Sequence, residues 1–260
     1  MDTIPYRVSA STRINDRGLQ KPNEDHILID DLHHIFIILD GITRVHDEYI
    51  DFPGESAASD VNCIFSEAVR SYILMHKDEF DPQSLLRNAA IVGNQAIIPY
   101  RNRRSKSQWQ FFPGTLGIIS LIQKQQFHYL YVGDCQGTVI RQGAKFHFGK
   151  QGQTEALELM RISKAERYDR YCNHPTEPLG YGIFNGDVEA VELFEQSSFE
   201  LQPGDTVMLA TDGLSRHIQY ARSADLINQT PEQIIENSCI WDCPPFAKYA
   251  DDKALIKLEF

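Results

Sequence analysis

Apolar positions along the chain follow two periods, one typical of helices and one typical of buried strands. Over residues 55–76 they recur every three or four positions, which predicts an amphipathic helix. A second helix is predicted from Asp81, a favoured N-cap residue that is followed by a proline. Further helical structure is expected at about 153–170 and after Thr230, which has the spacing of a capping box with Gln233.

Six short segments are rich in aliphatic and β-branched residues and predict strands: 35–39, 116–122, 128–132, 138–141, 206–210 and 254–260. Several are apolar on both alternating faces, which is typical of sheets covered on both sides. The short polar sequence QKQQ separates 116–122 from 128–132 and indicates an antiparallel hairpin. Because the strands come in hairpins and the helices in separate pairs, we expect an α+β fold: a four-layer sandwich of two mainly antiparallel β-sheets flanked by helices.

Length, charge and cysteine content narrow the class of protein. The 260 residues contain no internal repeat or flexible linker, so we expect a single domain over residues 1–260. A net charge of −11 repels nucleic-acid phosphates and anionic lipids, so neither nucleic acid nor a membrane is an expected partner. No apolar run is long enough to span a bilayer, and no secretory signal is evident. Five scattered cysteines favour a reducing, cytoplasmic location over a disulfide framework.

Acidic residues fall where the predicted strands begin or end: Glu24-Asp25, Asp40-Gly41, Gly133-Asp134, Asp212-Gly213 and Asp251-Asp252. An Asp-Gly pair alone is weak evidence, because it is also a favoured hairpin turn. Acidic positions that converged, however, would repel one another unless cations lay between them. Carboxylate oxygens are the ligands that Mg²⁺ and Mn²⁺ prefer, and two such ions sharing a carboxylate suit in-line displacement at phosphorus.

Other catalytic patterns fit less well. Residues 133–137 (GDCQG) have the outline of a nucleophile elbow, but a predicted strand follows where an elbow needs a helix. Neither of the usual Gly-rich nucleotide-binding motifs is present. A metal centre is therefore the chemistry that the sequence favours.

Several motifs in order resemble those of the metal-dependent protein phosphatases of the 2C type, the PPM family. They are GLQKPNED, Asp40-Gly41 after an apolar strand, Pro113-Gly114-Thr115 before a strand, YVGD, LQPGDTVMLATDGL and the terminal DDKALIKL. The resemblance extends over residues 7–260. It implies a β-sandwich flanked by helices, two Mn²⁺ or Mg²⁺ ions, and hydrolysis of phosphoserine and phosphothreonine in proteins. A phosphorylated protein substrate and a cognate Ser/Thr kinase are the implied partners.

The resemblance also implies a role for the acidic residues. Asp40 would bridge both metal ions, and Gly41 would bind through its carbonyl oxygen. Asp212 and Asp251 would complete the coordination of one ion, so Asp40, Asp212 and Asp251 are the implied catalytic carboxylates. The nucleophile would be a water that bridges the two ions as hydroxide, deprotonated by their charge.

The remaining acidic positions have subsidiary implied roles. Glu24 and Asp25 would act mainly through bound water, and Asp134 would lie at an accessory metal position. The family often has a second Asp for this accessory ion, four residues after the aspartate of TDGL. Here that position is Arg216, whose positive charge would oppose a third cation.

The chain departs from the family pattern around the substrate. The Arg that anchors phosphate is replaced by Gln20, and the His that commonly follows Asp-Gly as a proton donor is replaced by Ile42. The Gly- and His-rich turn after it is replaced by a longer loop that extends to residue 54. The Asn after the last metal-binding Asp is Asp252. Metal binding is therefore expected to be intact, while the handling of phosphate and leaving group is expected to differ.

Three cationic or donor side chains are nearest in sequence to take the place of the missing Arg. They are Lys21, Arg44 and His46, and the alternative is that all three are simply solvated. The leading hypothesis is an active metal-dependent phosphatase. The alternatives are a weakly active or inactive relative that binds a phosphoprotein as a regulatory module, and hydrolysis of a small phosphorylated molecule.

Overall fold

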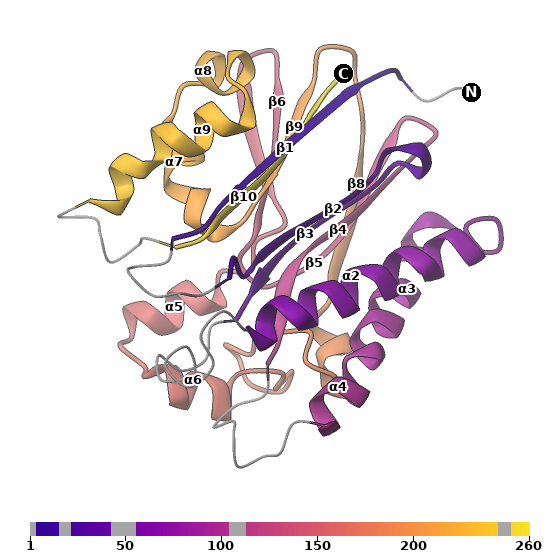
Figure 1. Cartoon of the computed structure of the whole chain (residues 1–260), viewed down its shortest axis with the longest axis vertical. Helices are drawn as coiled ribbons and strands as arrows, with labels where there is room; N and C mark the ends of the chain where they lie inside the picture. The colour runs from indigo at the N-terminus through magenta and orange to yellow at the C-terminus, as the bar shows by residue number, and fades with distance from the viewer. Residues whose placement is uncertain (1–3, 16–21, 43–55, 104–112, 244–250) are drawn as a thin grey trace.

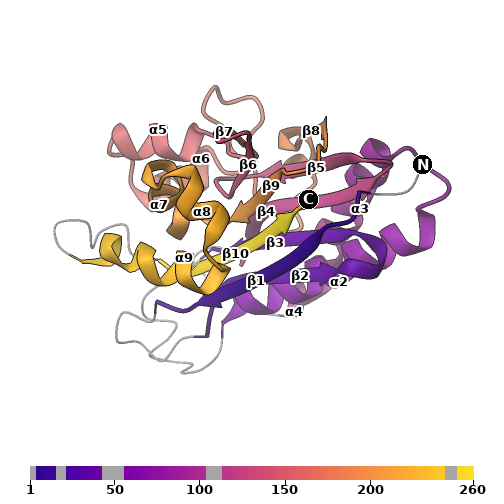
Figure 2. The same cartoon turned by 90° about the horizontal axis from the view of Figure 1, so that it is seen from above.

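Two five-stranded antiparallel sheets stack face to face at the centre of the structure (Figure 1). It is a computed structural model that describes residues 4–15, 22–42, 56–103, 113–243 and 251–260. The first sheet has the order β1 (Arg7–Arg13), β10 (Lys253–Glu259), β9 (Thr206–Ala210), β6 (Gln136–Arg141) and β7 (Ala144–Phe148). The second has the order β2 (Asp25–Asp30), β3 (Ile35–Gly41), β4 (Thr115–Gln123), β5 (Gln126–Val132) and β8 (Glu195–Glu200). Helices cover both outer faces (Figure 2), so the expected α+β four-layer sandwich is confirmed.

The predicted strands are the interior strands of the two described sheets. Interior strands are buried on both faces, and their continuous apolar runs are therefore visible in the sequence. The edge strands β1, β2, β7 and β8 carry more polar residues, and the hydrophobic pattern does not predict them; β8 reads EQSSFE and is mostly exposed. The predicted hairpin is β4–β5, whose turn places Lys124 and Gln125 at φ angles of 51° and 65°.

Helices α2 (Ala57–His76) and α3 (Pro82–Ala96) pack on the outer face of the second sheet (Figure 2). Both predicted helices are confirmed, and the second begins at its predicted N-cap, Asp81. Ser56 Oγ accepts a hydrogen bond from a backbone N–H of the first turn of α2, and Asp81 does the same for α3. The apolar stripe of α2 is buried at helical spacing by Val61, Phe65, Val69 and Ile73.

The outer face of the first sheet is covered by α7 (Ser215–Tyr220), α8 (Ser223–Asn228) and α9 (Pro231–Ser238). The predicted capping box at the start of α9 is confirmed. Thr230 Oγ1 accepts from the Gln233 backbone N–H at 3.4 Å, and Gln233 Oε1 accepts from the Thr230 N–H at 3.0 Å. None of the described helices combines the length and the apolarity that a membrane crossing needs.

The helical structure predicted at 153–170 is divided between α5 (Gln153–Leu159) and α6 (Lys164–Arg170). The chain turns between them because Arg161 adopts a left-handed conformation, with φ of 60°. Ser163 then caps α6 by accepting from the Glu166 N–H at 3.2 Å. Both helices lie at one end of the sandwich (Figure 1), where they pack on a small core of their own: Leu157, Tyr171, Cys172, Tyr181 and Ile183.

A buried polar network holds the chain at this end of the molecule. Asn185 is fully buried, and its Oδ1 accepts from Asn173 Nδ2 at 3.0 Å and from the Asp187 N–H at 2.9 Å. We expect Asn185→Ala to lower the free energy of unfolding by about 2–4 kcal/mol, because it leaves several buried polar groups without partners. Urea unfolding would measure this loss, with the exposed Asn228→Ala as a control that changes stability by less than about 0.5 kcal/mol. Equal stability of the two variants would contradict a stabilising role for the network.

Candidate metal centre

The acidic strand ends lie together at one edge of the sandwich. Asp40 is the next-to-last residue of β3, Asp134 follows β5, and Asp212 follows β9. One carboxylate oxygen from each of these three residues lies within 4.8 Å of the others. The register of β2 on β3 places Asp25 directly opposite Asp40, so both project on the same side of the sheet. The structure therefore brings four of the predicted site residues together.

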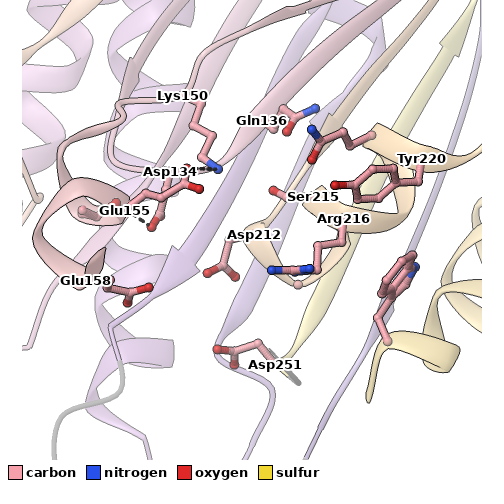
Figure 3. Close-up of a pocket in the computed structure, with 14 residues that line it drawn as sticks. Asp134, Gln136, Lys150, Glu155, Glu158, Asp212, Ser215, Arg216, Tyr220 and Asp251 are labelled. Carbon is pink, nitrogen blue, oxygen red and sulfur yellow. Dashed lines mark hydrogen bonds and ion pairs between the residues drawn. The ribbon is translucent and has the colours of Figure 1, made fainter. Parts of the chain in front are cut away.

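A pocket of about 430 Å³ opens beside this cluster (Figure 3). Its described charged lining consists of Asp134, Glu155, Glu158, Asp212 and Asp251 together with Lys150 and Arg216. In Figure 3 the carboxylates of Asp212 and Asp251 face the same space. The charge of Asp251 also raises the pKa of both Asp40 and Asp212, which makes it part of the same electrostatic cluster.

The carboxylates at this edge hold protons more tightly than free carboxylates do. Burial is the main cause that raises the pKa of Asp40 well above its ordinary value, and the charges of Asp212 and Asp25 raise it further. Burial also raises the pKa of Asp212, followed by the charge of Asp134. Because Asp212 faces the open pocket, water screens its charge better than that of Asp40. Divalent cations would relieve this repulsion, so the donor set fits Mg²⁺ or Mn²⁺.

Two residues beside the cluster fix its geometry. Thr211 Oγ1 donates to Asp25 Oδ2 at 2.6 Å and accepts from the Ala254 N–H at 2.9 Å. Asp252 is buried, and its two carboxylate oxygens accept from the backbone N–H groups of Glu24 at 2.8 Å and Asn15 at 2.7 Å. A carboxylate serves this position because it offers an acceptor oxygen to each N–H, whereas an Asn would offer only one acceptor.

Glu24 is tied to the start of α2 and to the end of β3. Ser56 Oγ donates to Glu24 Oε1 at 2.6 Å, and the Glu24 carbonyl accepts from the Gly41 N–H at 2.9 Å. A Cβ atom at position 41 would lie 2.6 Å from that carbonyl oxygen and 2.9 Å from Ala58 Cβ, so only glycine fits there. The close approach holds Gly41 beside Asp40 at the acidic edge.

Ile42, the residue that follows Asp40-Gly41, has an apolar side chain. It is half-buried and packs against both the main core and the small core beneath α5 and α6. Its backbone N–H donates to the Gly114 carbonyl at 3.0 Å. The neighbouring Thr115 Oγ1 donates to the Asp40 carbonyl at 3.0 Å, which gives the Pro-Gly-Thr motif a role in fixing the end of β3.

The candidate phosphate-binding residues Lys21, Arg44 and His46 lie outside the described residues. The structure instead places two further polar residues at the site, which the sequence pattern does not indicate. Lys150 lines the pocket from the segment after β7, and Ser56 contacts Glu24 from far along the chain. Neither has a local sequence signal, because each becomes relevant only through its position in the folded chain.

No protein-family model matches the sequence, and no curated protein is similar to it in sequence. The structure, in contrast, is similar to solved phosphatases over nearly their whole length. The serine/threonine phosphatase PstP/Ppp of Mycobacterium tuberculosis is 19% identical with a TM-score of 0.66, and the match covers 98% of each chain. The catalytic domain of PstP in complex with two manganese ions is 18% identical with a TM-score of 0.62, covering 98% of this chain and 97% of the other.

Two further structures extend the similarity. PppA, a key regulatory component of T6SS in Pseudomonas aeruginosa, is 14% identical with a TM-score of 0.66 and covers 99% of this chain and 98% of its own. The PPM Ser-Thr phosphatase MsPP of Mycobacterium smegmatis is 13% identical with a TM-score of 0.63, and the match covers 98% of each chain. As the order of its motifs predicts, the chain has the fold of the PPM-type serine/threonine phosphatases.

Proposed function

We propose that this protein hydrolyses phosphoserine and phosphothreonine in proteins with two divalent metal ions, Mn²⁺ or Mg²⁺. The observation that carries the proposal is the convergence of carboxylate oxygens of Asp40, Asp134 and Asp212 within 4.8 Å, in a fold shared with phosphatases. The neighbouring PstP structure with two manganese ions supports the number of ions. We also propose a single domain over residues 1–260, because the main core includes residues of both sheets and of α2 and α3.

Seven residues would hold the metal ions: Glu24, Asp25, Asp40, Gly41, Asp134, Asp212 and Asp251. Asp40 would be shared between the two ions, and Asp212 and Asp251 would complete one of them. The chemistry that two ions held by these residues would supply is an activated water as the nucleophile and neutralisation of charge on the phosphate. The hydrogen bonds of Thr115 to the Asp40 carbonyl and of Thr211 to Asp25 keep these ligands oriented before any ion binds.

The partners follow from this activity. A phosphorylated protein is the proposed substrate, and a Ser/Thr kinase that phosphorylates it is the proposed opposing enzyme. A cytoplasmic location is proposed from the sequence, whose five scattered cysteines suit a reducing compartment better than a disulfide framework. Lys21, Arg44 and His46 stay candidates for contacts to the substrate phosphate.

A second function is favoured by one observation. Ile42 fills space between two cores at the position where a proton donor to the leaving group is common in the family. A protein without that donor could still bind a phosphorylated partner through its metal ions. The second candidate is therefore a weakly active or inactive phosphoprotein-binding module.

Hydrolysis of a chromogenic phosphate ester and of a phosphothreonine peptide separates the two functions. We expect purified protein with Mn²⁺ to release phosphate from both compounds, and protein treated with a chelator to lose this activity. Phosphate release that does not exceed the metal-free blank would favour the binding module instead.

A further inference from the structure

The pocket beside the acidic cluster is lined by two basic side chains as well as by carboxylates. We infer that Lys150 and Arg216 bind the phosphate group of the substrate, one from each side of the pocket. The inference rests on the proposed function and assigns the phosphate-binding residues of that same site. Among the described residues that line the pocket, these are the two basic side chains.

Lys150 reaches the pocket from the segment that follows β7. Its ammonium lies 3.6 Å from Glu155 Oε2, which is longer than the 2.7–2.9 Å of a strong charge-assisted hydrogen bond. Its side chain keeps 33% of its surface exposed, so it is accessible from the pocket. The Lys150 charge also offsets part of the rise that burial causes in the pKa of Asp134 and of Asp212, which is consistent with its position next to the cluster. The loosely held ammonium is therefore available to a phosphate that enters beside these two carboxylates.

Arg216 approaches from the opposite side, on the first turn of α7. It follows Asp212 by one turn of chain, and both residues line the pocket. Figure 3 shows its guanidinium pointing toward the space around Asp212, across from the Lys150 ammonium. A guanidinium presents two parallel N–H donors that match the oxygens of a phosphate. The Lys150 ammonium, a point charge, and the Arg216 guanidinium, with two parallel donors, therefore face the pocket from two sides.

The charge balance of the pocket fits this assignment. Five carboxylates line it in the described structure, against the two cations. Two divalent ions at the cluster would offset four of these five negative charges, and a phosphate monoester would then bring about two negative charges of its own at neutral pH. Lys150 and Arg216 are placed to compensate that incoming charge. The competing explanation is that they only neutralise the carboxylates, in which case removing them would affect metal binding and not phosphate binding.

Calorimetric titration with inorganic phosphate tests the inference directly. The titrations would use Mg²⁺-saturated wild type, Lys150→Ala and Arg216→Ala, with Lys77→Ala and Arg222→Ala as controls. Both control residues are exposed and lie outside the pocket lining. We expect each pocket variant to bind phosphate at least about tenfold more weakly, as for loss of a hydrogen bond to a charged group. The controls should match the wild type, and Lys150→Arg should recover most of the lost affinity.

Kinetics with the chromogenic ester supply a second readout. Each pocket variant should raise KM by a similar factor, with Mg²⁺ affinity close to that of the wild type. Wild-type turnover with unchanged KM and phosphate affinity in both variants would overturn the inference and leave the proposed function intact. Undetectable phosphate binding by the wild type would also overturn it. Wild type without turnover would reject the proposed function, and the phosphate titration would still decide whether Lys150 and Arg216 form an anion site.

Discussion

Asp212→Asn is expected to lower kcat for a phosphate ester by at least about a hundredfold while leaving the fold intact. Loss of a residue that only supports a metal ligand already costs roughly 10–100-fold, and Asp212 is proposed to be a ligand itself. The amide that replaces the carboxylate removes a negative charge and one oxygen donor from a site built for hard cations. The side chain faces the open pocket, so the substitution removes no packing from a core.

The measurement is the rate at saturating Mn²⁺, with circular dichroism to confirm the fold. Asp78→Asn is the matched control, because Asp78 is exposed just beyond the end of α2 and far from the pocket lining. The control should retain the wild-type rate. Retention of more than about a tenth of the wild-type rate by Asp212→Asn would reject Asp212 as a metal ligand.

Asp40→Asn is expected to raise the melting temperature of the metal-free protein and to reduce the stabilisation that Mn²⁺ gives. Burial and the neighbouring carboxylates raise the pKa of Asp40, so its charge destabilises the metal-free folded protein near neutral pH. The variant without metal should therefore melt at a higher temperature than the wild type at pH 7.5. Mn²⁺ at a hundred times its Kd should stabilise the wild type by about 2.7 kcal/mol, or roughly 5–10 °C, and the variant by less.

The pH dependence of this difference has a definite sign. A carboxyl group whose folded pKa is raised binds more protons in the folded state than in the unfolded chain. The destabilisation caused by Asp40 is therefore full above its raised folded pKa and disappears as the pH falls toward about 4, the pKa of Asp in the unfolded chain. Comparing wild type with Asp40→Asn cancels the opposite contribution of histidines such as His26, whose pKa is lowered by burial. A stability gain that grew on acidification would contradict this explanation.

The interior of the fold follows from the sequence more fully than its edges do. Strands such as β3 and β4 are buried on both faces, so nearly every residue in them is apolar and the run is recognisable. Edge strands such as β1 (RVSASTR) are half-exposed, and their partner is decided by tertiary contacts instead of composition. The break between α5 and α6 is also not predictable from the helical pattern, because it depends on the left-handed conformation of one residue, Arg161.

Some residues of the candidate site could likewise be predicted from the sequence, and others could not. Asp40, Asp134 and Asp212 could be predicted because each lies at or just after the end of an apolar strand, and these strand ends meet at one edge. Lys150 and Ser56 could not, because they approach from segments that have no chemical motif of their own. Their contribution appears only when the fold places their side chains beside residues more than ten positions away in the sequence.

Calorimetric titration of the chelator-treated protein with Mn²⁺ tests most directly whether the acidic edge is a two-metal centre. We predict that the wild type binds two Mn²⁺ ions per chain, as the two manganese ions of the PstP neighbour suggest. Asp40→Asn, which removes the proposed shared ligand, should bind both ions more weakly. Absence of binding by the wild type, or unchanged stoichiometry and affinity in Asp40→Asn, would contradict a metal centre built on Asp40.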